Sequence, residues 1–300
     1  MIEIGLCTDE NYAMPCGICI TSIFESNKNI PIRIHILTEK LSPGSIQKFR
    51  KTASLYNQQI EIHIIDFSIF NHYPTTSQFQ KSIYFRFLFP EILPDSINKL
   101  LYIDCDTIIN NELQTLWNTD FLKDYYCGVI EDQGSDDIRI RNRIDLHENY
   151  FNSGILLINL DLWRKNKISE QCMQYIQKNP EKCIYPDQDA LNVVLQKKIY
   201  WLHFKYNLQE NLFWRKELLF LRKEKWSEIE EAKLNPTIIH FCGFIKPWHK
   251  DCKHPLNQTF IYYKNISLWK DVKLSYKQSL KRRIINKIKK TKNKFEYQSI

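Results

Sequence analysis

Short apolar segments of strand length alternate with helix-like segments through the first half of the chain. Ile2, Ile4 and Leu6 alternate with other residues, the segments 32–37 and 60–65 repeat this pattern, and helical stretches run through about 15–27 and 43–56. Strands that alternate with helices predict βαβ units and a mostly parallel sheet. Ligands of such sheets bind outside the carboxyl ends of the strands, so residues that directly follow a strand are candidates for function.

The second half continues the same alternation with less regularity. A short apolar strand at 100–103 ends in carboxylates, a longer strand is predicted at 150–160 with a helix over about 162–178, and a last strand lies near 237–241. The aromatic-rich segment 200–226 has no clean period and remains unassigned. With 300 residues, 43% of them hydrophobic, and with no repeat or linker before about residue 270, the chain is expected to form one α/β domain over 1–270 with an appendage over 271–300.

The net charge of +8 belongs to the C-terminal appendage. Residues 273–294 hold ten Lys or Arg and no acid, so the rest of the chain carries 32 basic against 34 acidic residues. A nucleic-acid-binding domain would spread its basic residues over a folded face, so no nucleic-acid partner is expected. Tyr276, Leu280, Ile284 and Ile288 recur every four residues, which predicts a basic amphipathic helix on an anionic membrane surface. A disordered, solubilising tail is the alternative.

The location of the protein is predicted from what the chain lacks. There is no apolar run of 18 residues, and the N-terminus has the pattern of a first strand rather than that of a signal peptide. These features predict a cytoplasmic protein, peripheral on the inner face of the cytoplasmic membrane if the appendage binds lipid. The nine cysteines are an odd number without a framework spacing. Cys16 and Cys19 fit the buried stripe of a helix, with a redox or zinc site as the alternative.

Two carboxylates, Asp104 and Asp106, directly follow the apolar strand at 100–103. Side chains at i and i+2 lie on the same side of an extended chain, where two anions repel each other unless a cation joins them. A divalent metal ion is such a cation, and a solvated turn is the alternative. Only seven glycines occur, and neither of the common glycine-rich nucleotide motifs is present, which favours a metal-assisted mode of nucleotide binding.

Further polar groups follow other strands of the predicted sheet. Asp9 to Tyr12 come after the first strand, where they can contact a base or begin a helix. Asn152 opens a strand, and Gln188 lies between two acids in a segment that contacts a sugar or merely begins a helix. The segment 240–248 combines His240, a possible metal ligand, with the phosphate-compatible Gly243 and Lys246.

Taken together, these motifs resemble glycosyltransferase family 8, and within it the bacterial lipopolysaccharide and lipooligosaccharide galactosyl- and glucosyltransferases of the α-1,4-galactosyltransferase type. The resemblance covers about residues 1–270 and rests on six ordered motifs, which are Asp9-Glu10-Asn11-Tyr12, Tyr84-Phe85-Arg86, Leu101-Tyr102-Ile103-Asp104-Cys105-Asp106, Tyr150-Phe151-Asn152-Ser153-Gly154, Asp187-Gln188-Asp189 and the segment from His240 to His249. It implies a GT-A fold, with a Rossmann-like mixed sheet flanked by helices. It also implies a UDP-sugar donor, Mn²⁺ with Mg²⁺ as the alternative, and retention of anomeric configuration.

The resemblance also implies a role for each matching position. The implied metal ligands are Asp104, Asp106 and His240. The implied contacts of the uridine are Thr8, Asp9, Asn11 and Tyr12, and those of the diphosphate are Gly243 and Lys246. The implied contacts of the donor sugar are Arg86, Asn152, Asp187 and Gln188. Cys105 and Ser153 lie inside the donor-binding motifs but replace residues more common in the family. Gln188, with Asp187 and Asp189, matches the catalytic segment.

The resulting hypothesis is a retaining hexosyltransferase that moves galactose or glucose from a UDP-sugar to a hydroxyl of a saccharide acceptor, such as lipopolysaccharide, lipooligosaccharide or another cell-surface glycan. An acceptor glycan linked to a protein is one alternative. A sugar-nucleotide nucleotidyltransferase is a second, although it would ordinarily carry a glycine-rich loop where this chain has Asp9 to Ala13. A non-enzymatic carbohydrate-binding protein is the third. Segment 133–149, where the acceptor would lie, matches the family poorly.

Overall fold

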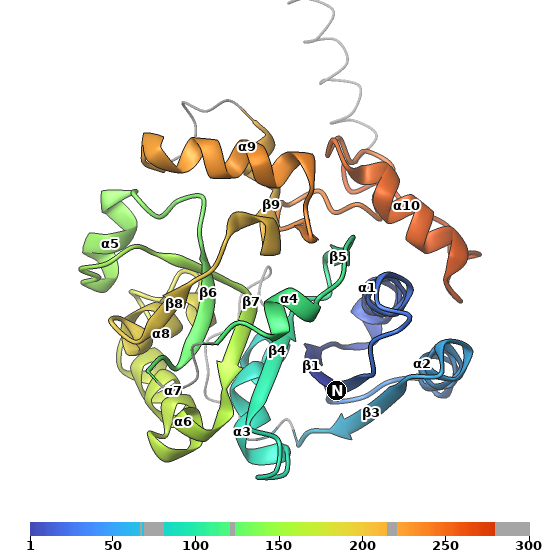
Figure 1. Cartoon of the computed structure of the whole chain (residues 1–300), viewed down its shortest axis with the longest axis horizontal. Helices are drawn as coiled ribbons and strands as arrows, with labels where there is room; N and C mark the ends of the chain where they lie inside the picture. The colour runs from blue at the N-terminus through green and yellow to red at the C-terminus, as the bar shows by residue number, and fades with distance from the viewer. Residues whose placement is uncertain (67, 69–80, 121–123, 215–220, 280–300) are drawn as a thin grey trace, which may run out of the picture.

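The computed structural model describes residues 1–66, 68, 81–120, 124–214 and 221–279. These residues form a seven-stranded sheet in the order β3-β2-β1-β4-β7-β6-β8 and a three-stranded sheet in the order β5-β10-β9 (Figure 1). The large sheet consists of β1 (Ile2–Cys7), β2 (Ile32–Thr38), β3 (Gln59–Ile64), β4 (Lys99–Ile103), β6 (Cys127–Glu131), β7 (Phe151–Asn159) and β8 (Ile199–Trp201). The small sheet consists of β5 (Thr107–Ile109), β9 (Leu208–Gln209) and β10 (Ile238–His240).

The large sheet is mixed. Strands β1, β2, β3 and β4 are parallel, as the strand–helix alternation predicts, while β7 runs antiparallel to both of its neighbours, β4 and β6. The carboxyl end of β4 therefore meets the beginning of β7, and the backbone N–H of Asp104 donates to the carbonyl of Gly154 at 2.8 Å. The mixed sheet agrees with the one that the resemblance implies.

Each face of the large sheet carries its own hydrophobic core, as the period of two along the strands requires. Leu101 and Ile103 of β4 pack in the core beneath α1 (Ala13–Ser26) and α2 (Pro43–Tyr56). Leu100 and Tyr102 point to the other core, beneath η3 (Lys81–Leu88) and α3 (Phe89–Ile92). The strand is buried on both sides, so its polar continuation at Asp104 is the first point where it can meet solvent.

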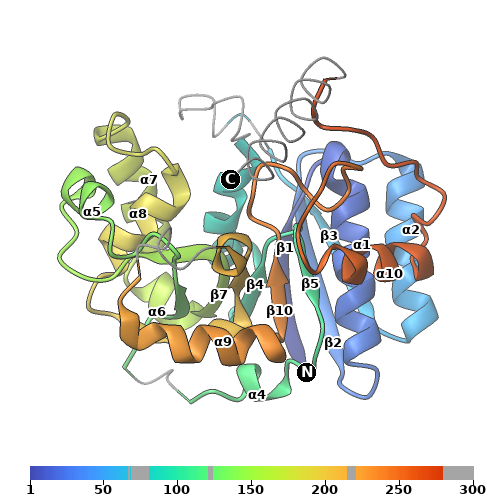
Figure 2. The same cartoon turned by 90° about the horizontal axis from the view of Figure 1, so that it is seen from above.

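The remaining helices cover the second half of the sheet and the small sheet (Figure 2). They are α4 (Gln114–Trp117), α5 (Ile138–Ile144), α6 (Leu160–Lys165), α7 (Ile168–Lys178), α8 (Pro186–Leu195), α9 (Trp226–Leu234) and α10 (Asn257–Ile266). The prediction of one helix over 162–178 is wrong: two helices are separated at Lys167, whose φ of 51° is incompatible with a continuous right-handed helix. The unassigned segment forms short 3₁₀ turns, η4 (Phe204–Tyr206), η5 (Glu210–Phe213) and η7 (Lys223–Lys225), between β8, β9 and α9.

Two other predictions concern cysteines and membranes. Cys16 and Cys19 lie fully buried inside α1, and both are free thiols, as their helical spacing predicts. Within the described ranges, no helix is long and apolar enough to span a bilayer. Most of the predicted amphipathic helix at 273–294 lies outside the described residues, which end at Ser279.

Candidate active site

Asp104, Asp106 and His240 converge at the junction of the two sheets. Asp104 follows β4, Asp106 precedes β5, and antiparallel pairing of β5 with β10 places His240 opposite Thr107. One ligand atom of each residue lies within 4.8 Å of the others. His240 Nε2 is 3.2 Å from Asp106 Oδ1 and 4.0 Å from Asp104 Oδ2. The three side chains thus form a compact set of two carboxylates and one imidazole.

The hydrogen bonds of His240 determine which ring nitrogen faces the carboxylates. Asn207 donates through Nδ2 to Asn152 Oδ1 at 2.9 Å, which leaves its Oδ1 as the acceptor for His240 Nδ1, also at 2.9 Å. A neutral ring that donates from Nδ1 presents a lone pair at Nε2. That lone pair faces the Asp106 carboxylate, so a shared cation is the natural partner of both groups.

Gly154 allows the side chains of His240 and Asp104 to pack directly against the backbone of β7. A Cβ atom at this position would lie 2.3 Å from His240 Cε1 and 2.9 Å from Asp104 Oδ2. Any larger residue would therefore push His240 or Asp104 away from the set. The donor set of two carboxylates and one imidazole fits a divalent metal ion.

Asp106 and Lys246 form an ion pair, with Lys246 Nζ 2.6 Å from Asp106 Oδ2. Burial opposes ionisation of Asp106, but Lys246 and His240 outweigh burial and hold the pKa of Asp106 below its usual range. The same pair raises the pKa of Lys246 although burial acts against its charge. The site therefore holds a permanent positive charge next to the carboxylate set.

Asp104 has different surroundings. Tyr102 OH donates to Asp104 Oδ1 at 2.6 Å, and Arg86 Nη2 lies 3.1 Å from the same oxygen. Burial nevertheless raises the pKa of Asp104, since it outweighs Arg86, and the negative charge of Asp106 acts in the same direction. Oδ1 is therefore held by the protein, whereas Oδ2 points toward His240 and Gly154.

Arg86 connects Asp104 to the start of α8. Its Nη1 lies 2.9 Å from Asp187 Oδ2 and donates to the carbonyl of Ser153 at 2.9 Å, while its guanidinium stacks on the Tyr102 ring at 4.6 Å. Only 5% of Arg86 is exposed. Arg86 is thus buried and held in place between two carboxylates, that of Asp104 after β4 and that of Asp187 in α8.

Gln188 is the next polar residue of α8 after Asp187, the partner of Arg86. Its Oε1 accepts from Ser153 N at 2.9 Å and from Asn152 Nδ2 at 3.2 Å, and its Nε2 donates to Asp132 Oδ2 at 3.4 Å. Asn152 Nδ2 also donates to Asp132 Oδ2, at 3.2 Å. The side chains of Asn152 in β7, Gln188 in α8 and Asp132 after β6 are therefore one hydrogen-bonded network, which the backbone N–H of Ser153 joins.

The residues after β1 differ in how far they are exposed. Thr8 is buried, Asn11 is exposed, and the Asp9 carboxylate accepts from Tyr12 N at 2.9 Å, which is the helix-capping contact considered as the alternative for it. Tyr12 is 41% exposed and contacts Trp248 edge-on with ring centroids 5.5 Å apart. The exposed Tyr12 ring leaves a flat apolar surface beside Lys246.

Two residues that the sequence analysis included in the site have side chains that point away from it. Cys105 lies between the two acids but faces the core, where its thiol donates to the carbonyl of Cys7 at 3.2 Å. Asp189 is fully buried, and its oxygens are bound by Arg143 Nη2 at 2.9 Å, Tyr150 OH at 2.7 Å and Tyr185 N at 2.9 Å. Adjacent residues of a strand or a helix point to different sides. The side chains of Cys105 and Asp189 therefore hold their own segments in place and do not face the site.

Three residues of the site were missed. Asp132 follows β6 directly, so the same strand-end rule would have indicated it had β6 been recognised. Asn207 orients His240, and Glu210 Oε2 accepts from Gly243 N at 3.0 Å, where the resemblance implies a diphosphate contact. Burial raises the pKa of both Asp132 and Glu210. Asn207 and Glu210 lie in the segment 200–226, which has no periodic pattern from which a site residue could be predicted.

Residues 3–252 match the family model described as Glycosyl transferase family 8. The matched span includes every residue of the carboxylate, imidazole and lysine set.

Curated relatives extend over nearly the same span. General stress protein A of Bacillus subtilis (strain 168) is 28% identical over 278 residues, covering 91% of this chain and 96% of that protein. Lipopolysaccharide glucosyltransferase WaaO of Escherichia coli (strain K12) is 30% identical over 286 residues, covering 91% of this chain and 80% of that protein.

A solved structure shares the fold. The galactosyltransferase LgtC, in complex with donor and acceptor sugar analogues, superposes with a TM-score of 0.81 at 23% identity, covering 89% of this chain and 96% of that chain. The two-sheet arrangement that brings β4, β5 and β10 together is therefore a known fold.

Proposed function

Because the chain belongs to glycosyltransferase family 8, we propose that it is a retaining hexosyltransferase that moves galactose or glucose from a UDP-sugar to a saccharide hydroxyl of a cell-surface glycan. Relatives described as lipopolysaccharide glucosyl- and galactosyltransferases, at 27–30% identity, support lipopolysaccharide or lipooligosaccharide as the acceptor class. Residues 1–270 form the catalytic domain in this proposal. A glycan linked to a protein is the alternative acceptor, and donor hydrolysis without transfer to lipopolysaccharide in the assay below would favour it.

One observation carries the proposal: ligand atoms of Asp104, Asp106 and His240 lie within 4.8 Å of one another. They would hold the divalent cation, with Mn²⁺ proposed and Mg²⁺ as the alternative. When bound, the cation supplies Lewis-acid stabilisation for the diphosphate of the donor.

Lys246 adds positive charge for the leaving group. Negative charge grows on UDP as the bond from the sugar to the phosphate breaks, and an ammonium group aimed at that charge lowers the barrier. Lys246 is buried in the free protein and neutralises Asp106 there. Gly243 N–H would donate to the same diphosphate in exchange for Glu210, and Thr8, Asp9, Asn11 and Tyr12 would bind the uridine.

The surroundings of Gln188 support attack by the acceptor on the face that the nucleotide leaves. An amide oxygen is a weak nucleophile, and Oε1 already accepts from Ser153 N and Asn152 Nδ2. These donors withdraw electron density from the oxygen and hold it in place. Gln188 would therefore stabilise the charge on the sugar, with Asp187, Arg86 and Asn152 orienting its hydroxyls. We assign Asp189 to positioning α8, because its oxygens are occupied.

The C-terminal appendage is proposed to bind the cytoplasmic face of the membrane, where a lipid-linked acceptor would lie. The ten basic residues in 273–294 would each add on the order of 1 kcal/mol of attraction to anionic lipid. Sedimentation with phosphatidylglycerol vesicles should pellet the full chain and not a chain that ends at Val272. Equal pelleting of both would contradict this role.

Release of UDP tests the enzymatic proposal. The full chain is incubated with a panel of UDP-sugars, with and without Mn²⁺, and slow donor hydrolysis is followed. We expect hydrolysis of UDP-galactose or UDP-glucose only with the metal, and transfer when lipopolysaccharide acceptors are added. Asp104→Asn should abolish both reactions. Substantial metal-dependent activity in Asp104→Asn would remove Asp104 from the metal site. Formation of a UDP-sugar and pyrophosphate from UTP and a sugar 1-phosphate would indicate a nucleotidyltransferase.

A further inference from the structure

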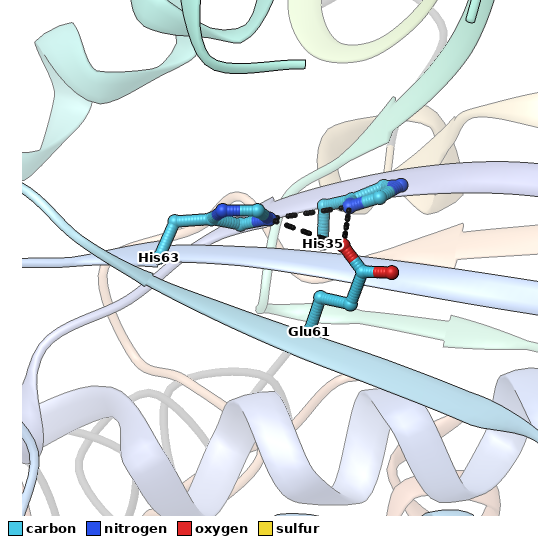
Figure 3. A group of neighbouring side chains, drawn as sticks. All are labelled: His35, Glu61 and His63. Carbon is cyan, nitrogen blue, oxygen red and sulfur yellow. Dashed lines mark hydrogen bonds and ion pairs between the residues drawn. The ribbon is translucent and has the colours of Figure 1, made fainter. Parts of the chain in front are cut away.

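A second cluster of metal-compatible side chains lies at the β3 edge of the large sheet, on other strands than the Asp104 set. His35 of β2 is paired in register with Glu61 of β3, and His63 lies two residues further along β3. Residues two apart on a strand share a face, so Glu61 and His63 both flank His35. Figure 3 shows the three side chains converging from the two strands.

The distances in this cluster match those between the ligands of one tetrahedral ion. His35 Nδ1 lies 3.2 Å from His63 Nε2 and 3.4 Å from Glu61 Oε2, and the third distance, His63 Nε2 to Glu61 Oε2, is 3.9 Å. Ligands about 2.0–2.1 Å from a tetrahedral zinc ion are separated by about 3.4 Å. A small movement of the exposed Glu61 side chain closes the longest edge.

Glu3 of β1 determines which nitrogen of His35 faces the cluster. Glu3 Oε2 lies 3.0 Å from His35 Nε2, on the side of the ring away from His63. A neutral His35 that donates to Glu3 presents the Nδ1 lone pair to Glu61 Oε2. Two acceptors are then directed at one point, which favours a cation between them. A carboxylate behind a ligating imidazole is the usual support of a zinc site.

Arg33 leaves one oxygen of Glu61 available. Its Nη1 lies 3.6 Å from Glu61 Oε1, whereas Oε2 faces the two imidazoles. The side chain of His35 is fully buried, those of His63 and Glu61 are 24% and 45% exposed, and an ion can therefore enter from solvent. Arg33 also offsets part of the negative charge of Glu3 and Glu61.

We propose that His35, His63 and Glu61 bind a zinc ion, with Glu3 holding His35 in the ligating tautomer. Two imidazoles and one carboxylate suit zinc better than the harder cations that favour oxygen ligands. The ion joins the edge strand β3 to β2 and stabilises the sheet far along the chain from the catalytic set. The competing arrangement is a protonated His35 held between Glu3 and Glu61 without metal.

Zinc titration of the full chain tests the proposal, with competition against a chromophoric chelator as the readout. Asp106→Asn serves as the background, since it weakens the other metal set. One equivalent of zinc should bind in this background, and Co²⁺ in its place should give the visible absorption of a tetrahedral site. Adding His63→Gln should abolish that equivalent and the Co²⁺ spectrum. His147→Gln, a change at a histidine whose side chain is 75% exposed, is the matched control and should alter neither.

Two further measurements make the outcome decisive. Glu3→Gln should weaken zinc binding about 10- to 100-fold without changing the stoichiometry. His63→Gln in the wild-type chain should keep its circular dichroism and its sugar transfer. In the Asp106→Asn background, His63→Gln should remove the rise in Tm that zinc causes. Absence of a zinc equivalent in the Asp106→Asn chain, or its persistence after His63→Gln, would overturn the proposal and leave the protonated arrangement.

Discussion

Lys246 Nζ lies 2.6 Å from Asp106 Oδ2, although the two residues are 140 positions apart in the chain. Both are largely buried, with 16% and 13% of their side chains exposed. In the free protein this ion pair compensates a carboxylate that belongs to the proposed metal set. Binding of a metal–diphosphate would offer each partner a new counter-charge, so donor binding and rearrangement of this pair are expected to be coupled.

The first prediction follows from that pair. Lys246→Met should lower kcat/KM for sugar transfer by about 10²- to 10³-fold, because it removes a buried charge aimed at the leaving group. The substitution should also raise the pKa of Asp106, because burial then acts on this carboxyl group without the positive charge of Lys246 to oppose it. Steady-state kinetics with UDP-galactose and UDP-glucose measure the effect. Lys250→Met, a change at an exposed lysine of the same segment, is the control, and equal rates for the two variants would contradict the role of Lys246.

The second prediction concerns the space beside His240. Gly154→Ala would place a methyl group 2.3 Å from His240 Cε1, so His240 or Asp104 must move, and metal-dependent transfer should fall at least about 100-fold. Isothermal titration with Mn²⁺ and UDP should show a matching loss of affinity. Gly44→Ala, whose added methyl group meets nothing closer than Ser42 Oγ at 3.9 Å, is the control and should stay active. A fully active Gly154→Ala enzyme would place the metal elsewhere.

The third prediction separates function from stability at Asp132. Burial raises the pKa of this acid despite hydrogen bonds from Gly134 N, Asn152 and Gln188. A raised pKa in the folded state means that the ionised form is stabilised less by the fold than by water, so the charge destabilises the fold at neutral pH. Asp132→Asn should therefore raise Tm at pH 7, and the difference should shrink as the pH falls toward about 4, where the wild-type acid is protonated.

The activity of Asp132→Asn should fall although its Tm rises. Asp132→Asn should lower kcat, because Asp132 holds Asn152 and Gln188 beside the donor sugar in the proposed mechanism. Calorimetry and kinetics on the same preparations provide the measurements. Asp95→Asn, a change at a fully exposed acid, should affect neither quantity. A destabilised Asp132→Asn protein at pH 7 would contradict the burial argument.

The fourth prediction is a loss of stability in mild acid. His254 is 4% exposed, contacts Phe213 and Phe241 edge-on, and its Nδ1 accepts from Leu256 N. Burial lowers its pKa to about 4, so the unfolded chain takes up a proton between about pH 6.5 and pH 4 while the folded protein does not. The free energy of unfolding should fall over this window by up to about 3 kcal/mol.

Denaturant titrations at several pH values measure that fall. His254→Gln should flatten the pH dependence between pH 6.5 and pH 4, because the substituted side chain does not titrate there. His147→Gln should leave the dependence unchanged, since His147 is exposed. An unchanged slope in His254→Gln would assign the acid sensitivity to other groups.

Much of the candidate site could be predicted from the sequence because its residues are tied to strand ends. Asp104 and Asp106 follow a run of apolar residues that only a buried strand explains, and the C-terminal position of such a strand is where ligands meet an open α/β sheet. The resemblance then linked these acids to His240 and Lys246, more than 130 residues away, and the structure brings all four together.

The residues that were misplaced or missed have several local causes. Cys105 and Asp189 stand next to functional residues, yet the alternation of strands and the turn of a helix direct them away. Asp132 was missed because β6 was not recognised, and Asn207 and Glu210 because short 3₁₀ turns leave no periodic signal. Lys167, with its left-handed backbone, breaks a helix whose apolar pattern continues across the break.

The amino-acid sequence by itself determined the alternation of strands and helices, the burial of the central strands and the positions of the carboxylates, since each depends on local periodicity of side chains. Tertiary structure alone decided which atoms face one another: His240 toward Asp106 through pairing of β5 with β10, and His35 toward Glu61 and His63 through the register of β2 and β3. Local periodicity specifies the face of a strand or helix, whereas the pairing of distant segments depends on packing across the whole fold.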